Sequence, residues 1–256
     1  MKITIFLSLI VSMSFAQNSI CGEMEYTYTT NLNYFYQEDY KMIFNDSVSY
    51  SEEINHEKVD KKLKKERANG KLTNKIIVAK QNKPSFYYNN NNEFYISEFL
   101  EKTILIVKED SFDWDWDLHP ETKKIGNFDC QKATIKFRGR DYTAWFTKQI
   151  PVKYGPWKFQ GLPGLILEVY EDNDALHIVT NRISVNEKEN CPINFDESKL
   201  KDALSIEKYL QKRKEKVKAK LARISSKLPK GSKPLVLDEN CEDCNSGKLE
   251  IFNKEK

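Results

Sequence analysis

The segment of the sequence most suited to shape a binding site covers residues 151–164, Pro-Val-Lys-Tyr-Gly-Pro-Trp-Lys-Phe-Gln-Gly-Leu-Pro-Gly. It holds three of the chain's eight prolines and three of its nine glycines. Proline fixes φ and lacks an N–H, while glycine adopts conformations that a Cβ forbids, so the pattern predicts a stiff connection rather than a helix or a central strand. Its Tyr154, Trp157 and Leu162 either pack on a sheet as part of a rigid crossover or line a ligand pocket.

Arg140 and Trp145, just before this segment, are the other candidate binding residues. They lie on a predicted strand, where a strand-end ion pair is one explanation for the charge of Arg140. The alternative is that both residues join the three candidates of 151–164 in binding an apolar or peptide-like ligand. Both interpretations stay open at the level of the sequence.

Residues 112–118 alternate apolar side chains with carboxylates, in the order Phe-Asp-Trp-Asp-Trp-Asp-Leu. The Asp-x-Asp-x-Asp spacing opens an EF-hand loop, but Leu118 stands where that loop needs glycine and Lys124 where it needs a bidentate glutamate. An EF-hand is therefore excluded. The alternation predicts a half-buried strand with its apolar side chains on one face and its carboxylates on the other.

The spacing of the cysteines and histidines gives little support to a metal, redox or hydrolytic site. The sequence predicts no metal site and no cofactor, because a zinc site at Cys241 and Cys244 would need two further ligands and the flanks lack a thioredoxin-like pattern. Disulfides are favoured in an exported chain, with the connectivity left open and one thiol left over among Cys21, Cys130, Cys191, Cys241 and Cys244. The zinc-protease helix and the Gly-x-Ser-x-Gly elbow are both absent from the sequence.

Residues 1–16 predict a secretory signal peptide that is cleaved after Ala16. Lys2 precedes an apolar run, and Ser14 and Ala16 supply the small residues that a signal peptidase requires. Later apolar runs are too short to cross a bilayer, so no transmembrane segment is expected after cleavage. The signal peptide predicts export, which in a Gram-negative cell leads to the periplasm or the periplasmic face of the outer membrane.

The fold class predicted for residues 17–190 is α+β and mainly β, a curved antiparallel sheet or partly closed barrel. Aromatic residues make up 12% of the chain, enough for a sizeable core, which excludes a disordered protein. Short alternating runs separated by turn residues predict the strands, which are expected at 23–29, 40–44, 47–50, 94–97, 103–107, 112–118, 132–137, 142–147, 165–170 and 176–185. Residues 55–74 and 89–92 are expected to be loops or insertions.

Residues 191–234 predict a basic helical arm, and residues 235–256 a polar tail that contains cysteine. Apolar side chains recur at three- and four-residue steps from Leu200 to Leu228, as one long helix or two helices broken near Ser205. Residues 199–233 contain 13 basic and three acidic side chains, a local charge of +10. Such an arm suits lipid phosphate or an acidic envelope partner, whereas nucleic acid is excluded as a partner by export.

The chain resembles the GLPGLI family of exported Bacteroidota proteins. The resemblance rests on Cys130 to Ala133, Gly139 to Thr147 with its Ala-Trp-Phe-Thr element, and above all on residues 161–166, which read Gly-Leu-Pro-Gly-Leu-Ile. It implies a Gram-negative envelope location and a mainly β fold. It implies no biochemical activity.

The function expected from the sequence is that of a non-enzymatic envelope protein that binds or carries an apolar or peptide-like ligand. An envelope hydrolase or peptidase with scattered catalytic residues is the first alternative. The second is an accessory protein of an outer-membrane complex, in which the basic helix docks on an acidic partner.

Overall fold

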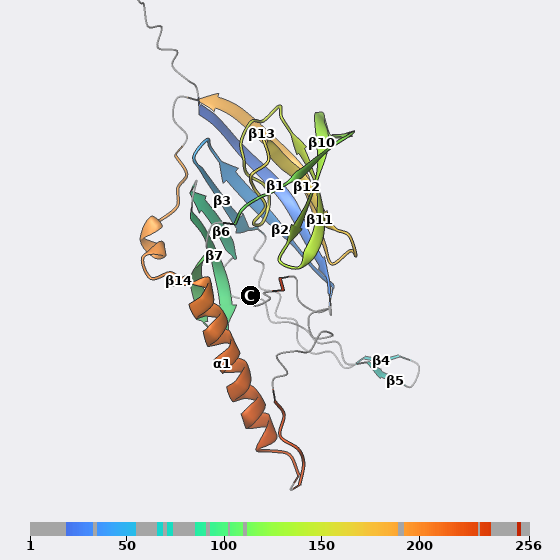
Figure 1. Cartoon of the computed structure of the whole chain (residues 1–256), viewed down its shortest axis with the longest axis vertical. Helices are drawn as coiled ribbons and strands as arrows, with labels where there is room; N and C mark the ends of the chain where they lie inside the picture. The colour runs from blue at the N-terminus through green and yellow to red at the C-terminus, as the bar shows by residue number, and fades with distance from the viewer. Residues whose placement is uncertain are drawn as a thin grey trace, which may run out of the picture.

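The computed structural model of the chain shows a single large sheet with one long helix extending from it (Figure 1). It describes residues 19–32, 35–54, 66–68, 71–73, 85–90, 93–101, 103–109, 112–188, 192–229, 231–236 and 250–251. The predicted signal peptide and the cysteines at 191, 241 and 244 lie outside the described residues.

Twelve strands form the large sheet, in the order β14-β8-β7-β6-β3-β2-β1-β13-β12-β11-β10-β9. Every pairing is antiparallel except that of β14 with β8. The bounds are β1 Ser19–Asn31, β2 Phe35–Phe44, β3 Val48–Glu53, β6 Phe86–Asn90, β7 Glu93–Leu100, β8 Thr103–Glu109, β9 Asp117–Ile125, β10 Phe128–Phe137, β11 Arg140–Thr147, β12 Leu165–Glu171, β13 Leu176–Lys188 and β14 Leu204–Ser205. The prediction of a mainly β fold with an antiparallel sheet and a C-terminal helix is confirmed, and the sheet is open.

One face of the sheet carries the core because the strands alternate in polarity. In β1, Met24, Tyr26 and Tyr28 are buried while the residues between them are more exposed. Side chains on a strand point to opposite faces in turn, so this alternation buries one face and leaves the other to solvent. β13 pairs with β1 from Ser19 opposite Lys188 to Thr30 opposite Leu176, which joins the two halves of the sheet.

The segment 151–164 crosses the apolar face, and the prediction that it forms neither helix nor strand is confirmed except for one bridge between Tyr154 and Gln160. Two of its glycines are required by geometry. Gly161 has φ +91°, and a Cβ there would lie 2.7 Å from the Cβ of Trp114. A Cβ on Gly164 would lie 2.1 Å from the carbonyl oxygen of Thr147. The last strand residue of β11 and this segment are therefore in backbone contact, which only glycine permits.

The prediction of a strand over residues 112–118 is wrong for most of its length. Phe112 to Trp116 follow an irregular path, and β9 begins only at Asp117. Phe112, Trp114 and Trp116 do pack against the core while the aspartates between them are exposed, so the alternation was meaningful. The indole N–H of Trp116 donates to the carbonyl oxygen of Gln160 at 2.8 Å. Trp114 and Trp116 therefore pack on the segment 151–164, and their backbone does not pair with a neighbouring strand.

Two expected loops contain strands, and β9 and β14 were not expected as strands. Asn89 and Asn90 belong to β6, and residues 66–68 and 71–73 form a small hairpin, β4 (Glu66–Ala68) and β5 (Lys71–Thr73). β9 escaped prediction because it is rich in charge and contains Pro120. Both features suit its place at the end of the sheet, where charged side chains and proline block further pairing.

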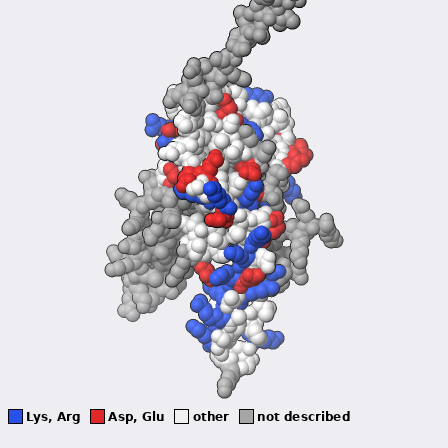
Figure 2. Space-filling view, turned by 90° about the vertical axis from the view of Figure 1, so that its left-hand side faces the viewer, with Lys and Arg blue, Asp and Glu red and all other residues white. Residues whose placement is uncertain are grey.

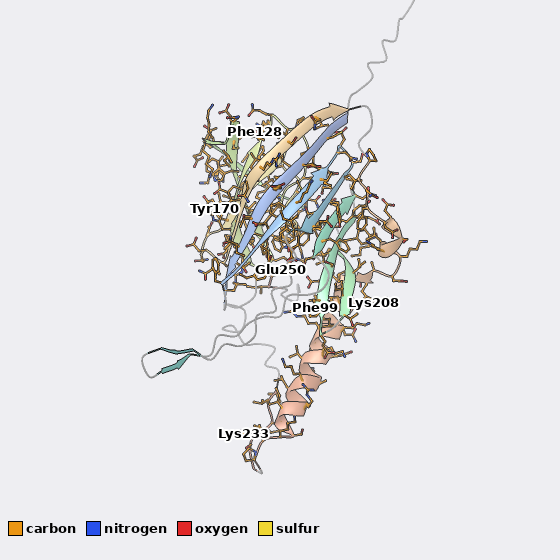
Figure 3. The ribbon with its side chains drawn as sticks, turned by 180° about the vertical axis from the view of Figure 1, so that it is seen from behind. Phe99, Phe128, Tyr170, Lys208, Lys233 and Glu250 are labelled. Carbon is orange, nitrogen blue, oxygen red and sulfur yellow. The ribbon has the colours of Figure 1, made fainter. Side chains whose placement is uncertain are left out.

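Helix α1 (Ile206–Ser225) begins at the far end of the sheet and extends away from it (Figures 1 and 3). A 3₁₀ helix at Glu197–Leu200 and the short β14 precede it, so the helical periodicity expected from Leu200 starts only at Ile206. Ser205 caps the helix by accepting the Lys208 N–H. Ile206 and Tyr209 pack with Phe94, Ile96 and Val107 in a second core cluster. Among the described residues, no helix has the length and apolar character to cross a membrane.

We expect Gly164→Ala to destabilise the fold by about 3 kcal/mol or more, because its Cβ would overlap the backbone of Thr147. Gly126→Ala is the matched control. Gly126 also has a positive φ, +57°, but nothing lies within 4 Å of its Cβ position, so only a left-handed backbone cost of about 1–2 kcal/mol is expected. Urea unfolding of both variants measures the difference, and equal losses would contradict the close contact at Gly164.

Candidate functional site

Lys158 is the buried cation of the crossing segment, and the backbone before it is strained. Its side chain is 3% exposed. Trp157 has φ +56°, a left-handed conformation that is uncommon for a bulky residue and costs about 1–3 kcal/mol. The Trp157 N–H donates to the hydroxyl of Tyr26 at 3.4 Å, which ties this turn to β1. Pro156 and the left-handed turn at Trp157 thus direct the lysine inward.

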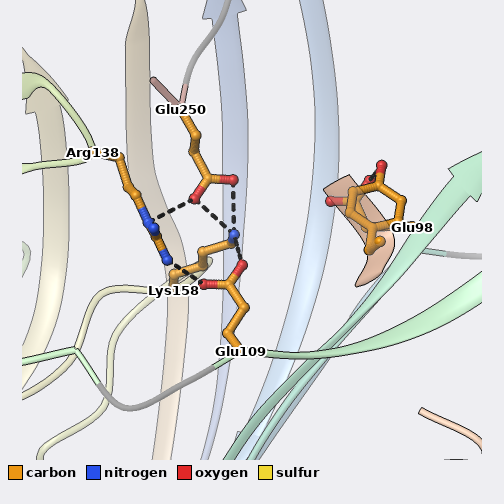
Figure 4. Close-up of polar contacts among 6 residues, drawn as sticks. Glu98, Glu109, Arg138, Lys158 and Glu250 are labelled. Carbon is orange, nitrogen blue, oxygen red and sulfur yellow. Dashed lines mark hydrogen bonds and ion pairs between the residues drawn. The ribbon is translucent and has the colours of Figure 1, made fainter. Parts of the chain in front are cut away.

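Three further charged side chains from distant parts of the chain lie around this lysine (Figure 4). The ammonium group of Lys158 donates to Glu109, the last residue of β8, and to both carboxylate oxygens of Glu250 at 2.8 Å each. Arg138, in the turn between β10 and β11, lies 3.5 Å from Glu109 and 3.9 Å from Glu250. We call these four residues the Lys158 cluster.

Burial and mutual charge set the protonation of the cluster. Burial alone would lower the pKa of Lys158, but the charges of Glu250 and Glu109 outweigh it and raise that pKa above its ordinary value. The pKa of Glu250 is also raised, first by burial and further by the neighbouring Glu109, against the opposing effect of Lys158. Lys158 is therefore firmly charged, whereas Glu250 is the less favourably ionised member of the cluster.

Aromatic rings surround the cations of the cluster. The Lys158 ammonium lies 5.4 Å from the ring centroid of Trp157, and the Arg138 guanidinium carbon lies 5.7 Å from that of Phe137. Phe137 and Trp157 also pack with Phe159 and Trp114 at centroid distances between 5.0 and 6.2 Å. Both cations therefore lie within reach of the electron-rich faces of aromatic rings, which attract positive charge.

The carboxylate of Glu250 reaches the cluster from the C-terminal part of the chain and not from the sheet. The N–H of Ile251 donates to the carbonyl oxygen of Arg138 at 3.0 Å, and the Ile251 side chain lies against Gly139. A carboxylate, a backbone N–H and an aliphatic side chain thus contact the body of the protein together. These are the groups that a short peptide would present.

The structure does not bring the five candidate binding residues predicted from the sequence together on one exposed surface. Tyr154, Trp157 and Leu162 are buried in the main core cluster. Arg140 instead pairs with Glu171 at 3.0 Å, which agrees with a strand-end ion pair. Trp145 lies half-buried beneath Lys123, whose ammonium is 4.4 Å from the ring centroid. Ligand contact by any of these five stays a prediction, and for the three core residues it would require the packing to open.

Sequence reasoning missed the Lys158 cluster. Lys158 carried a local signal, because it stands between Trp157 and Phe159 in a segment already chosen for its stiffness. Glu109 and Glu250 carried no local signal, because they are 141 positions apart and each is one of 38 acidic residues.

Cysteine and histidine side chains contribute to structure in the described part of the chain. Cys130 is a free, buried thiol whose pKa is raised to about 11, chiefly by burial, and Cys21 is disulfide-bonded. His119 contacts the hydroxyl of Thr134 at 2.7 Å, and His177 contacts Glu168 at 3.1 Å. The described residues hold no cluster of three or more metal-ligating side chains.

We expect Lys158→Met to destabilise the protein by about 3–5 kcal/mol, because it leaves Glu109 and Glu250 buried without their ammonium partner. Glu250→Gln should cost less than Lys158→Met does, since the amide oxygen still accepts from Lys158 and the repulsion by Glu109 is removed. Lys123→Met, which breaks a more exposed pair with Glu168, is the control and should also cost about 1 kcal/mol or less. Thermal or urea unfolding compares the three, and a Lys158→Met loss no larger than the control's would contradict the role of the buried pair.

Comparison with known proteins yields a match to part of the chain. A family model described as "Protein of unknown function (Porph_ging)" matches residues 138–168. The matched residues include Arg138, Lys158 and the stretch 161–166 that carries the resemblance to the GLPGLI family. A search of curated proteins found no match.

Solved structures show distant similarity. PNGF-II is 19% identical with a TM-score of 0.47, over 76% of this chain and 33% of that chain, so the present chain spans about a third of its length. The MucA/MucB complex of Pseudomonas aeruginosa is 8% identical with a TM-score of 0.32, over 70% of this chain and 55% of that chain. A LolA superfamily protein from Nitrosomonas europaea is 8% identical with a TM-score of 0.25, over 70% and 89% of the two chains. The family match covers part of the chain and assigns no activity.

Proposed function

We propose that this chain is an exported cell-envelope protein that binds, without catalysis, a peptide-like ligand with a free carboxylate and an apolar side chain. The ligand carboxylate binds Lys158 and Arg138, and its apolar part packs on the neighbouring aromatic rings. The observation that carries the proposal is the buried ammonium of Lys158, which Glu250 of the C-terminal part of the chain holds from outside the sheet.

The cluster requires a carboxylate at the position of Glu250, and its electrostatics act in the same way on a carboxylate of this chain and on one of a ligand. A buried ammonium left with a single carboxylate partner is poorly compensated, so the position of Glu250 must stay filled. Glu250 itself is unfavourably ionised there, because burial and Glu109 both raise its pKa. A ligand carboxylate in the place of Glu250 would pair with Lys158 in the same way, and the C-terminal residues would no longer need to be held against the protein. In this proposal, Glu250 occupies the ligand site when no ligand is bound.

The apolar part of the proposed ligand follows from the surroundings of the cluster. Ile251 lies against Gly139 and next to Glu250, so the occupant already combines an anionic group with an aliphatic one. Export, which the sequence predicts from residues 1–16, places the ligand among envelope components. The two described histidines do not support the alternative of an envelope hydrolase or peptidase, because they contact a threonine and a glutamate and not a serine or cysteine.

The test is a titration with a labelled apolar peptide that carries a free C-terminal carboxylate, beside the same peptide as its C-terminal amide. We expect the carboxylate form to bind at least about tenfold more tightly, because a charge-assisted hydrogen bond to a buried ammonium contributes about 1.5–3 kcal/mol. Glu250→Ala combined with Ile251→Ala should strengthen binding further by emptying the site.

Lys41→Met is the matched control for binding, because it removes an ion-paired lysine that belongs neither to the cluster nor to the five candidate residues, and it should leave binding unchanged. Equal binding of the two peptides, or weaker binding by the doubly substituted variant, would contradict the proposal.

A further inference from the structure

The far end of α1 carries an exposed apolar patch, which we call the arm tip. It consists of Ile224, Leu228, Leu235 and Val236, which are 39%, 37%, 43% and 78% exposed. Ser225 accepts the Leu235 N–H at 2.7 Å, so the chain after the helix folds back and brings residues 235 and 236 beside the end of α1 that carries Ile224 and Leu228. Exposed apolar side chains that cluster on a projecting element mark an interaction surface.

Basic side chains surround the arm tip. Residues 216–236 contain seven lysines and arginines and no aspartate or glutamate. Lys220, Arg223 and Lys227 are all exposed. Figure 2 shows basic side chains along this lower part of the molecule, with uncharged surface toward its end. In Figure 3, Lys208 marks the sheet end of the helix and Lys233 lies beyond its far end. The apolar tip is therefore presented beside exposed basic side chains, away from the sheet.

The charge of the rest of the chain determines which surface this tip can approach. Residues 199–233 carry a charge of +10, and the chain after removal of residues 1–16 carries +2, so the remainder carries −8. An anionic surface attracts the arm and repels the body, which orients the tip toward that surface. The arms of two copies would repel each other, because each brings an equal positive charge to the contact.

We propose that the arm tip inserts into an anionic lipid surface, with the apolar side chains among the acyl chains and the surrounding lysines and arginines on lipid phosphates. Aliphatic side chains bordered by long basic ones suit a lipid interface, because the stems of lysine and arginine cover apolar surface while their charges stay in water. The base of the helix stays on the body through Tyr209, which donates to Glu98 at 3.0 Å, and through Lys216, which pairs with Glu101 at 3.2 Å. This binding is independent of any ligand at Lys158.

Co-sedimentation of the mature chain with phosphatidylcholine vesicles, with and without phosphatidylglycerol, tests the inference. Binding should require phosphatidylglycerol and weaken as salt screens the charges. Lys220→Gln with Arg223→Gln should weaken binding about 30-fold, since each basic residue near an anionic surface contributes about 1 kcal/mol. Leu235→Ser with Val236→Ser should weaken it about tenfold or more through lost apolar burial.

Control substitutions on the sheet show whether the loss of vesicle binding is specific to the arm tip or follows from any loss of charge or apolar surface. Lys124→Gln with Lys136→Gln removes two exposed lysines of the sheet, and Val185→Ser removes an exposed valine of β13. Both should bind as the unchanged chain does, and circular dichroism should show the same fold for every variant.

Equal binding to vesicles without phosphatidylglycerol would overturn the inference. So would binding that the charge variant abolishes but the Leu235 and Val236 variant leaves unchanged, because the arm would then be a purely ionic surface suited to an acidic protein.

Discussion

Removing the ammonium group of Lys158 from water costs several kcal/mol unless carboxylates surround it, and the arrangement of the apolar face depends on meeting this requirement. Glu109 at the end of β8 and Glu250 near the C-terminus supply the charges, and Arg138 balances them. Four parts of the chain are thereby held at one point. The aromatic side chains around that point exclude water, which strengthens each of these ion pairs.

The one-sided sheet makes this burial feasible. Alternating strands such as β1 present tyrosine and methionine side chains on one face, and the stiff segment 151–164 lies across that face. Gly161 and Gly164 let the segment approach Trp114 and the backbone of Thr147, while the left-handed turn at Trp157 directs Lys158 inward. The left-handed backbone at Trp157 has a cost, which the surrounding packing and the ion pairs of Lys158 offset.

Local pattern predicted most of the sheet but not the cluster. Alternation in residues 23–29 and 142–147 marks real strands, and the prolines and glycines of 151–164 mark a real irregular crossing, because each of these features depends on near neighbours in sequence. The alternation of residues 112–116 led to a wrong strand prediction, because the tryptophans pack on the segment 151–164 and their backbone pairs with no strand. In the sequence, this arrangement has the same pattern as a half-buried strand. The partners of Lys158 lie on elements far away in sequence, so only the folded chain reveals them.

The two proposed functions lie in different parts of the molecule. The buried site at Lys158 binds a ligand, and the basic arm binds a lipid surface. The central claim is that a ligand carboxylate displaces Glu250, and amide hydrogen exchange at Ile251 tests it most directly. The Ile251 N–H donates to the carbonyl oxygen of Arg138, so it should be protected without ligand and lose protection when an apolar peptide with a free carboxylate is added. Unchanged or increased protection at Ile251 when that peptide is bound would contradict the account.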